Sequence, residues 1–151
     1  MTAEPVVMKT IEIAAPATEV WRILTETDKI AQWMGGAHVE SEWMPGSEVT
    51  FIGKLQRKAY RDCGTVLAVE RERLLKYSHW SGLSRLPDLP ENRTLITFNL
   101  DSTGEKARLT VRHERFYSDA AYKHSNFFWG FALADIKNLA ERGQIADDQR
   151  R

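Results

Sequence analysis

The chain is poor in cysteine and has no long apolar run. Its 151 residues include a single cysteine, Cys63, which excludes an intramolecular disulfide. No apolar segment approaches the roughly 18 residues that a membrane-spanning helix needs. The first residues also lack the apolar centre of a secretion signal. We therefore expect a reducing cytoplasm as the compartment and no membrane insertion.

The chain also has no excess of charge of either sign. Lys plus Arg and Asp plus Glu both number 21, so the formal net charge is zero. This balance argues against the broad basic surface of a nucleic-acid-binding protein. The length favours one domain over residues 1–151, with an ordered core at about 6–142, which is large enough to enclose a small cavity.

Metal and nucleophile motifs are absent. Zinc sites cluster three or four ligands at short spacing, and no such spacing links the available donors, His38, His79, His113, His124 and Cys63. No Gly-x-Ser-x-Gly turn is present. We expect no metal and no cofactor. Cys63 alternates with Thr65, Leu67 and Val69, which predicts one strand face with a buried, inert thiol.

Period-two alternation marks the strands, with turn signals such as Pro45-Gly46 between them. Two short helices are expected after the first strand: residues 17–25, and a second one capped by Thr27 or Asp28 that carries Ile30 and Trp33. The expected strands, about seven in antiparallel order, span residues 6–14, 38–43, 48–54, 60–70, 73–80, 94–101 and 107–115.

The last element has helical periodicity. It begins after Ser118, a good N-cap, and is expected to run to Arg142, where Gly143 ends it. Its apolar face is predicted to comprise Ser125, Phe128, Trp129, Ala132, Leu133, Ile136, Leu139 and Ala140. The element order predicts an α+β helix-grip fold, a curved antiparallel sheet of six to seven strands wrapped on a long C-terminal helix. A bent sheet and a straight helix leave a gap, which is the natural place for a cavity.

The connection from Lys76 to Asn92 is unusual because it is rich in apolar residues. It contains Trp80, Leu83, Leu86 and Leu89, although solvent gives a loop no reason to carry them. Two interpretations stay open, a satellite cluster packed beneath a long loop and a cover over a pocket.

Three segments carry a resemblance to a known family. They are Ala15–Thr25 (APATEVWRILT), Tyr77–Leu83 (YSHWSGL) and Pro87–Asn92 (PDLPEN), followed by the long final helix. The chain resembles the helix-grip superfamily of START-related lipid-transfer domains and polyketide cyclases (SRPBCC), and most of all the branch homologous to the C-terminal domain of the heat-shock-protein-90 ATPase activator. The second and third segments indicate a bacterial subgroup of single-domain proteins. The resemblance implies ligand binding, cyclisation, hydrolysis or co-chaperone activity.

Two histidines are the sharpest candidates for chemistry. His79 shares strand parity with Tyr77, and His113 shares it with Val111, so both imidazoles should point toward the helix. Such residues could orient a ligand or act as acid and base. A hydrogen-bonded core histidine is the alternative, and no partner carboxylate is evident from the sequence.

Aromatic residues suit the lining of an apolar site, although they fill cores as readily. We predict a cavity without catalytic residues, lined by Trp33, Phe51, Tyr77, His79, Phe98, His113, Phe128, Trp129 and Ala132. Phe127 and Phe131 lie one turn apart on the opposite side of the last helix. They should be covered, by a second copy of the chain or by the short helices or the Leu-rich loop.

Three functions remain open at this point. The first is a non-enzymatic module that binds a small hydrophobic or amphipathic molecule between sheet and helix. The second is a cyclase- or hydrolase-type enzyme using an inward histidine. The third is a protein-interaction domain, with a chaperone as partner, that uses the outer sheet face or the Leu83 to Leu89 loop.

Overall fold

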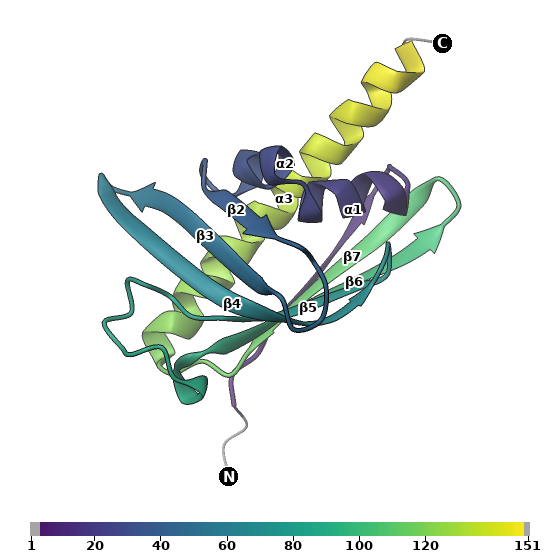
Figure 1. The fold of residues 1–151 in the computed structure, drawn as a ribbon. Coiled ribbons are helices and arrows are strands. Elements are labelled where there is room, and N and C mark those ends of the chain that lie inside the picture. Colours follow the sequence, from purple (N-terminus) through teal and green to yellow (C-terminus); the bar gives the residue numbers. More distant parts are fainter. Residues whose placement is uncertain (1–3, 150–151) are drawn as a thin grey trace.

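A computed structural model describes residues 4–149, so the expected domain limits at 1 and 151 lie outside the described residues. Within these residues, three α-helices accompany seven strands (Figure 1). In chain order the elements are β1 Val7–Ile13, α1 Ala17–Thr25, α2 Thr27–Trp33, β2 His38–Ser41, β3 Glu48–Leu55, β4 Lys58–Glu70, β5 Leu74–His79, the 3-10 turn Pro90–Asn92, β6 Thr94–Thr103, β7 Lys106–Glu114 and α3 Asp119–Gln149.

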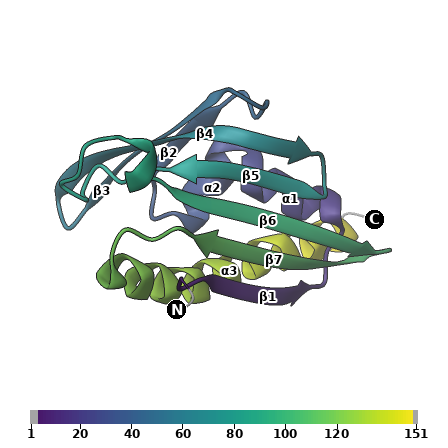
Figure 2. The same ribbon diagram turned by 90° about the horizontal axis from the view of Figure 1, so that it is seen from below.

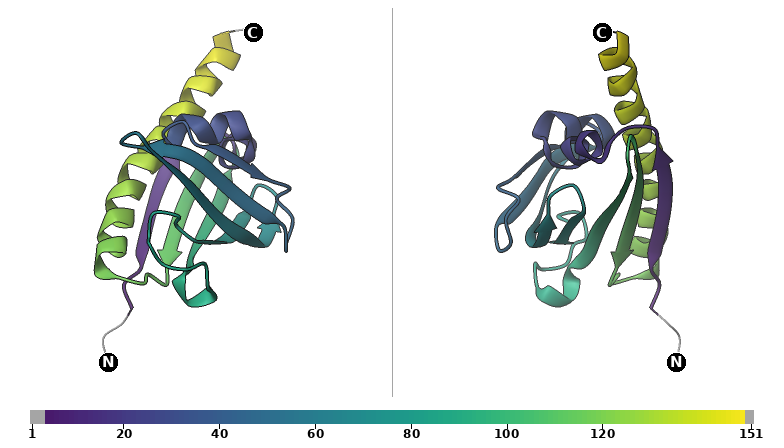
Figure 3. Two further views of the ribbon diagram at one scale, coloured as in Figure 1. Left: turned by 60° about the vertical axis from the view of Figure 1, so that its left-hand side comes forward. Right: turned by 90° about the vertical axis from the view of Figure 1, so that its right-hand side faces the viewer.

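All neighbouring strands are antiparallel, in the order β1-β7-β6-β5-β4-β3-β2 (Figure 2). The first strand therefore pairs with the last, with Val7 opposite His113. The helices lie on one side of the bent sheet, where α3 runs along it and α1 and α2 close one end (Figure 3). The predicted α+β helix-grip architecture is confirmed.

Helix α1 has the predicted limits, and its apolar stripe, which includes Val20, Trp21 and Leu24, is buried. The predicted cap of α2 is wrong. The N-cap is Glu26, which makes no side-chain capping bond. Thr27 instead donates its hydroxyl to the carbonyl of Val39 at 2.9 Å, so its side chain ties the helix to β2.

Helix α3 begins as predicted, since the Ala121 N–H donates to Ser118 Oγ at 3.1 Å. Its predicted end is wrong, because the helix continues past Gly143 to Gln149. A glycine inside a helix costs only about 1 kcal/mol. A Cβ at Gly143 would lie 3.2 Å from Glu19 Oε1. The glycine therefore marks the close approach of α1 rather than a helix end.

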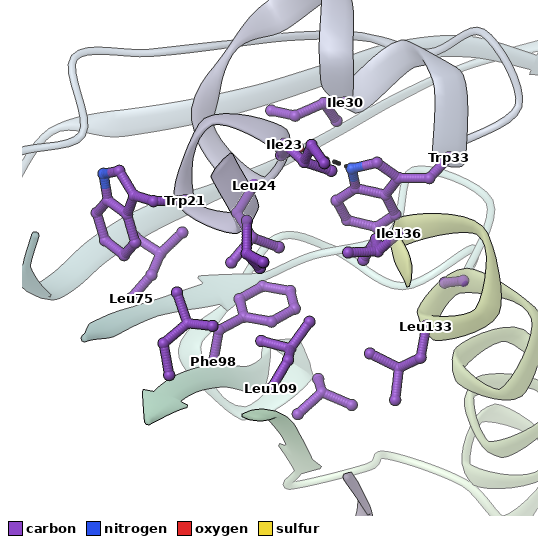
Figure 4. Packing of buried hydrophobic residues seen from close by; sticks show 14 of the residues in the cluster. Trp21, Ile23, Leu24, Ile30, Trp33, Leu75, Phe98, Leu109, Leu133 and Ile136 are labelled. Carbon is purple, nitrogen blue, oxygen red and sulfur yellow. Dashed lines mark hydrogen bonds between the residues drawn. The ribbon is translucent and has the colours of Figure 1, made fainter. Parts of the chain in front are cut away.

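The core fills the end of the interface that α1 and α2 cover (Figure 4). Trp21, Leu24 and Trp33 come down from these helices onto the sheet. The Trp33 indole N–H donates to the Ile23 carbonyl at 2.9 Å. Burial of an aromatic of this size contributes roughly 2 to 3 kcal/mol, so the short helices act mainly as a plug for this end.

Candidate functional site

A pocket of about 360 Å³ lies at the other end of the interface, which α1 and α2 leave uncovered. Its walls come from the strands β3 to β7, the first turns of α3 and the ends of three loops. Aromatic and aliphatic side chains dominate its lining, among them Phe51, Leu55, Leu83, Ile96, Phe116, Phe128 and Trp129. The bend of the sheet away from α3 produces this space.

The structure brings together most of the residues predicted to line a cavity. Those that line this pocket are Phe51, Tyr77, His79, His113, Phe128 and Trp129. Trp33, Phe98 and Ala132 do not line it, because they pack in the core. The ring of Phe98 lies edge-on to Trp129, with centroids 5.5 Å apart. Trp129 contacts Phe98 in the core and also lines the pocket, so it lies at the boundary between the two.

All the polar ring atoms of His113 are used by the protein. The Trp129 indole N–H donates to Nδ1 at 3.0 Å, and because an indole only donates, Nε2 must carry the ring proton. Nε2–H donates to Thr94 Oγ1 at 2.8 Å. Burial, with a smaller contribution from nearby His79, lowers the pKa of His113 to about 3. His113 is thus a neutral, hydrogen-bonded core histidine.

His79 has a different environment. Its Nε2 lies 3.0 Å from Asp62 Oδ2, and Asp62 Oδ1 accepts the Gly82 N–H at 2.8 Å. Within residues 4–149, Nδ1 of His79 makes no hydrogen bond. Every fully inaccessible side-chain nitrogen or oxygen in the described chain has a partner. Nδ1 is therefore reached from the pocket.

Tyr77, like His79, has a polar side-chain atom without a partner in the described chain. Only 4% of its surface is exposed, its ring packs on Phe51 with centroids 5.9 Å apart, and burial raises the pKa of its hydroxyl. No described residue pairs with that hydroxyl. Because every fully inaccessible side-chain oxygen in the described residues has a partner, this hydroxyl must keep some access to solvent. The hydroxyl opens onto the pocket, as His79 Nδ1 does.

Asp62 was missed by sequence reasoning. The predicted buried face of β4 was Cys63, Thr65, Leu67 and Val69, yet Leu67 is 45% exposed. A β-bulge between Val66 and Ala68 shifts the register. Before the bulge, the residues that point toward the helix are therefore those on the opposite strand face from Cys63, and they include Asp62. The sequence does contain a signal for Asp62, because its carboxylate alternates along the strand with Tyr60 and Val66 and so shares their face.

The loop after β5 divides between two surfaces. Ser81 and Leu83 line the pocket. The rest lies over the outer sheet face, where the Arg93 guanidinium donates to both Asp88 oxygens at 2.7 and 2.9 Å. Arg93 also donates to Ser78 Oγ at 3.1 Å. Both interpretations of this apolar loop are therefore correct in part.

Cys63 lies beneath the loop and is buried, as predicted. Its thiol is 3.4 Å from Asp88 Oδ2. Burial, together with this carboxylate, raises the pKa of the thiol. A raised pKa reduces the thiolate fraction and hence the reactivity. The thiol therefore belongs, with Asp88 and Arg93, to the hydrogen-bonded group that holds the loop on the sheet.

Phe127 and Phe131 are not covered by the short helices or by the loop, so that expectation is wrong. They are 69% and 62% exposed, and their rings contact each other with centroids 4.9 Å apart. No other part of the described chain shields them, because they face away from the sheet.

Among residues 4–149, no cluster of three or more His, Cys, Asp or Glu side chains is arranged to hold a metal ion. No helix in the same part of the chain has the length and apolar content to cross a membrane.

The chain is similar to known proteins over nearly its whole length. The family described as Activator of Hsp90 ATPase homolog 1-like protein matches residues 14–141. The solution structure of ChR145 from Cytophaga hutchinsonii is 31% identical, with a TM-score of 0.79, and the match covers 95% of this chain and 98% of that one. No curated protein matches significantly.

Two more distant structures share the fold. The crystal structure of MLL2253 from Mesorhizobium loti is 22% identical, with a TM-score of 0.74, over 91% of this chain and 98% of that one. The solution structure of the Aha1 dimer from Colwellia psychrerythraea is 18% identical, with a TM-score of 0.70, over 91% of this chain and 96% of that one.

Proposed function

The chain belongs to the family of Activator of Hsp90 ATPase homolog 1-like proteins, and on this premise we propose that it binds a small hydrophobic or amphipathic molecule in the pocket without transforming it. Family membership alone does not choose a function, because one fold hosts many. The proposal depends on the site, an apolar pocket of about 360 Å³, within the size range of small-molecule sites.

The observation that carries the proposal is the Tyr77 hydroxyl. The hydroxyl is accessible from the pocket, so an apolar molecule that fills the pocket without pairing with it would bury it unsatisfied, at a cost of roughly 1 to 3 kcal/mol. A ligand that pairs with the hydroxyl would offset this cost. His79 Nδ1, two residues along β5 on the same face, is a second unpaired atom.

A pair of substitutions on α3 tests ligand binding. Ala121 lines the pocket and Ala120 is exposed. We expect Ala121→Trp to fill the pocket and to abolish binding of a fluorescent apolar probe such as 1-anilinonaphthalene-8-sulfonate, whereas Ala120→Trp retains it. Equal binding by both variants would contradict the proposal, and native mass spectrometry of the purified protein would identify any molecule that is carried along.

The His79–Asp62 pair favours an acid–base enzyme as the second candidate. A histidine oriented by a carboxylate is a common general base. The two candidates differ in what happens to the molecule. Binding alone predicts that a ligand extracted after long incubation is chemically unchanged, whereas catalysis predicts conversion by the protein that stops in His79→Ala. A chaperone role would instead raise the ATPase rate of Hsp90, which the binding proposal leaves unchanged.

We also propose that two copies pair through Phe127 and Phe131. The exposed pair on α3 supports this, as does the fact that a structural relative is described as a dimer. Phe127→Glu together with Phe131→Glu should yield a monomer in sedimentation analysis, whereas Asn126→Glu, on the same exposed helix segment, should remain dimeric. A wild-type protein that sediments as a monomer at high concentration would rule the dimer out.

A further inference from the structure

Several polar side-chain atoms of the pocket lining make no hydrogen bond within the described residues, and two of them, His79 Nδ1 and the Tyr77 hydroxyl, come from the same face of β5. We propose that Asp62 sets the chemical class of the ligand by fixing the proton of His79 on Nε2, and that the polar end of the ligand is an uncharged hydroxyl rather than a carboxylate. This inference rests on the proposed function, that the pocket binds a small amphipathic molecule.

The position of Asp62 is fixed from the loop side. Its Oδ1 accepts the Gly82 N–H at 2.8 Å. A Cβ at Gly82 would lie 2.3 Å from the Arg61 carbonyl oxygen, so only glycine allows the loop backbone to approach β4 this closely. With Oδ1 held, Oδ2 stays directed at His79 Nε2, 3.0 Å away.

The carboxylate then determines the tautomer of His79. An ionised carboxylate only accepts hydrogen bonds, so Nε2 must carry the proton that bridges to Asp62 Oδ2. In the neutral ring Nδ1 is left as an acceptor. Phe51 meets the imidazole edge-on, with centroids 5.2 Å apart. The accepting atom therefore has a defined place in the pocket.

The matching ligand group follows from this arrangement. Tyr77 and His79 are two residues apart on the same face of β5, about 7 Å between Cα atoms. A hydroxyl donates to His79 Nδ1 and accepts from the Tyr77 hydroxyl, so it satisfies both atoms. An ether lacks the donated proton.

A carboxylate fits this end of the pocket poorly. It cannot donate, so it would face the lone pair of Nδ1, with the negative Asp62 behind the ring. Lys54 also lines the pocket but is exposed, and it lies three residues along β3 from Phe51, about 10 Å away. An anion drawn to Lys54 would leave Tyr77 and His79 unpaired.

The experiment uses three naphthalenes of similar size, 2-naphthol, 2-methoxynaphthalene and 2-naphthoate, titrated at pH 7.5. For the wild-type protein we expect 2-naphthol to bind about tenfold more tightly than the other two, which corresponds to about one hydrogen bond. The isosteric variant Asp62→Asn should change this order. Its Oδ1 keeps the Gly82 N–H, while its Nδ2 donates to His79 Nε2 and moves the ring proton to Nδ1.

With a donor in place of an acceptor, Asp62→Asn should bind 2-methoxynaphthalene and 2-naphthoate at least as tightly as 2-naphthol. The control is Asp101→Asn, the same change at an exposed position of β6, which should keep the wild-type order. The ¹⁵N shifts of the His79 ring report the tautomer without any ligand and should show Nε2–H in the wild type and Nδ1–H in Asp62→Asn.

The outcomes distinguish a failure of the ligand-binding function from a failure of the role assigned to Asp62. If none of the three compounds binds to the wild type, the ligand-binding function is contradicted. If they bind with the same order in wild type and Asp62→Asn, the assignment of Asp62 is overturned and the binding function stands. A His79 ring that carries its proton on Nδ1 in the wild type would overturn the assignment whatever the affinities.

Discussion

His79 and His113 both point into the space between sheet and helix, yet only one of them is available to a ligand. They lie on β5 and β7, on either side of β6. His113 donates to Thr94 and accepts from Trp129, whereas His79 has one nitrogen on Asp62 and the other without a protein partner. The comparison shows that the partners of a histidine, and not its orientation alone, decide whether it can serve a ligand.

The same contrast separates the two ends of the sheet and helix interface. At one end α1 and α2 insert Trp21, Leu24 and Trp33 and fill the space. At the other end neither α1 nor α2 inserts its side chains, and the pocket remains. His113 lies at the boundary, joined to Trp129, and His79 lies farther into the open end.

The largest difference expected between the two histidines is in stability. His113→Ala removes a buried ring and leaves the Trp129 indole N–H without its acceptor, so the free energy of unfolding should fall by about 3 to 5 kcal/mol. His79→Ala should cost about 1 kcal/mol, because Asp62 keeps the Gly82 N–H. Urea denaturation measures both values, and equal losses would mean that the two histidines contribute equally to the fold.

His113 should make a large contribution to the pH dependence of stability. Its pKa is about 3 in the folded protein and about 6.5 when unfolded. Between these values the unfolded chain binds a proton that the folded protein does not, so stability falls as the pH is lowered through this window. From pH 7 to pH 5 this amounts to about 2 kcal/mol.

The matched variant His113→Gln has no titrating group at this position. The stability advantage of the wild type over His113→Gln should therefore shrink by about 2 kcal/mol between pH 7 and pH 5. Urea unfolding at the two pH values gives the difference directly. An advantage that is constant or grows toward pH 5 would mean that His113 takes up a proton in the folded protein.

Much of the fold follows from sequence patterns that depend only on residues close together in the chain. Alternation located every strand, and Ser118 located the start of α3, because both signals depend on neighbouring residues. The end of α3 could not be read in this way. Gly143 looks like a stop signal until α1, distant in sequence, is found packed against it.

The candidate site was predictable only in part. The inward parity of Tyr77 and His79 on the regular strand β5 was correct. Asp62 was missed because the bulge in β4 inverts the alternation beyond it, and because the loop buries the outward Cys63 so that the wrong face looked apolar. Partners on distant elements, such as Trp129 on α3 for His113 on β7, depend on packing that no local pattern encodes.

The most direct test of a ligand site at the open end is Tyr77→Phe, which removes the unpaired hydroxyl and keeps the ring. Since no described residue pairs with that hydroxyl, the free energy of unfolding should stay within about 0.5 kcal/mol of the wild type or rise. The affinity for 2-naphthol should fall about tenfold. A variant that loses stability clearly while it binds 2-naphthol as well as the wild type would show that the hydroxyl serves the fold and would contradict the ligand site.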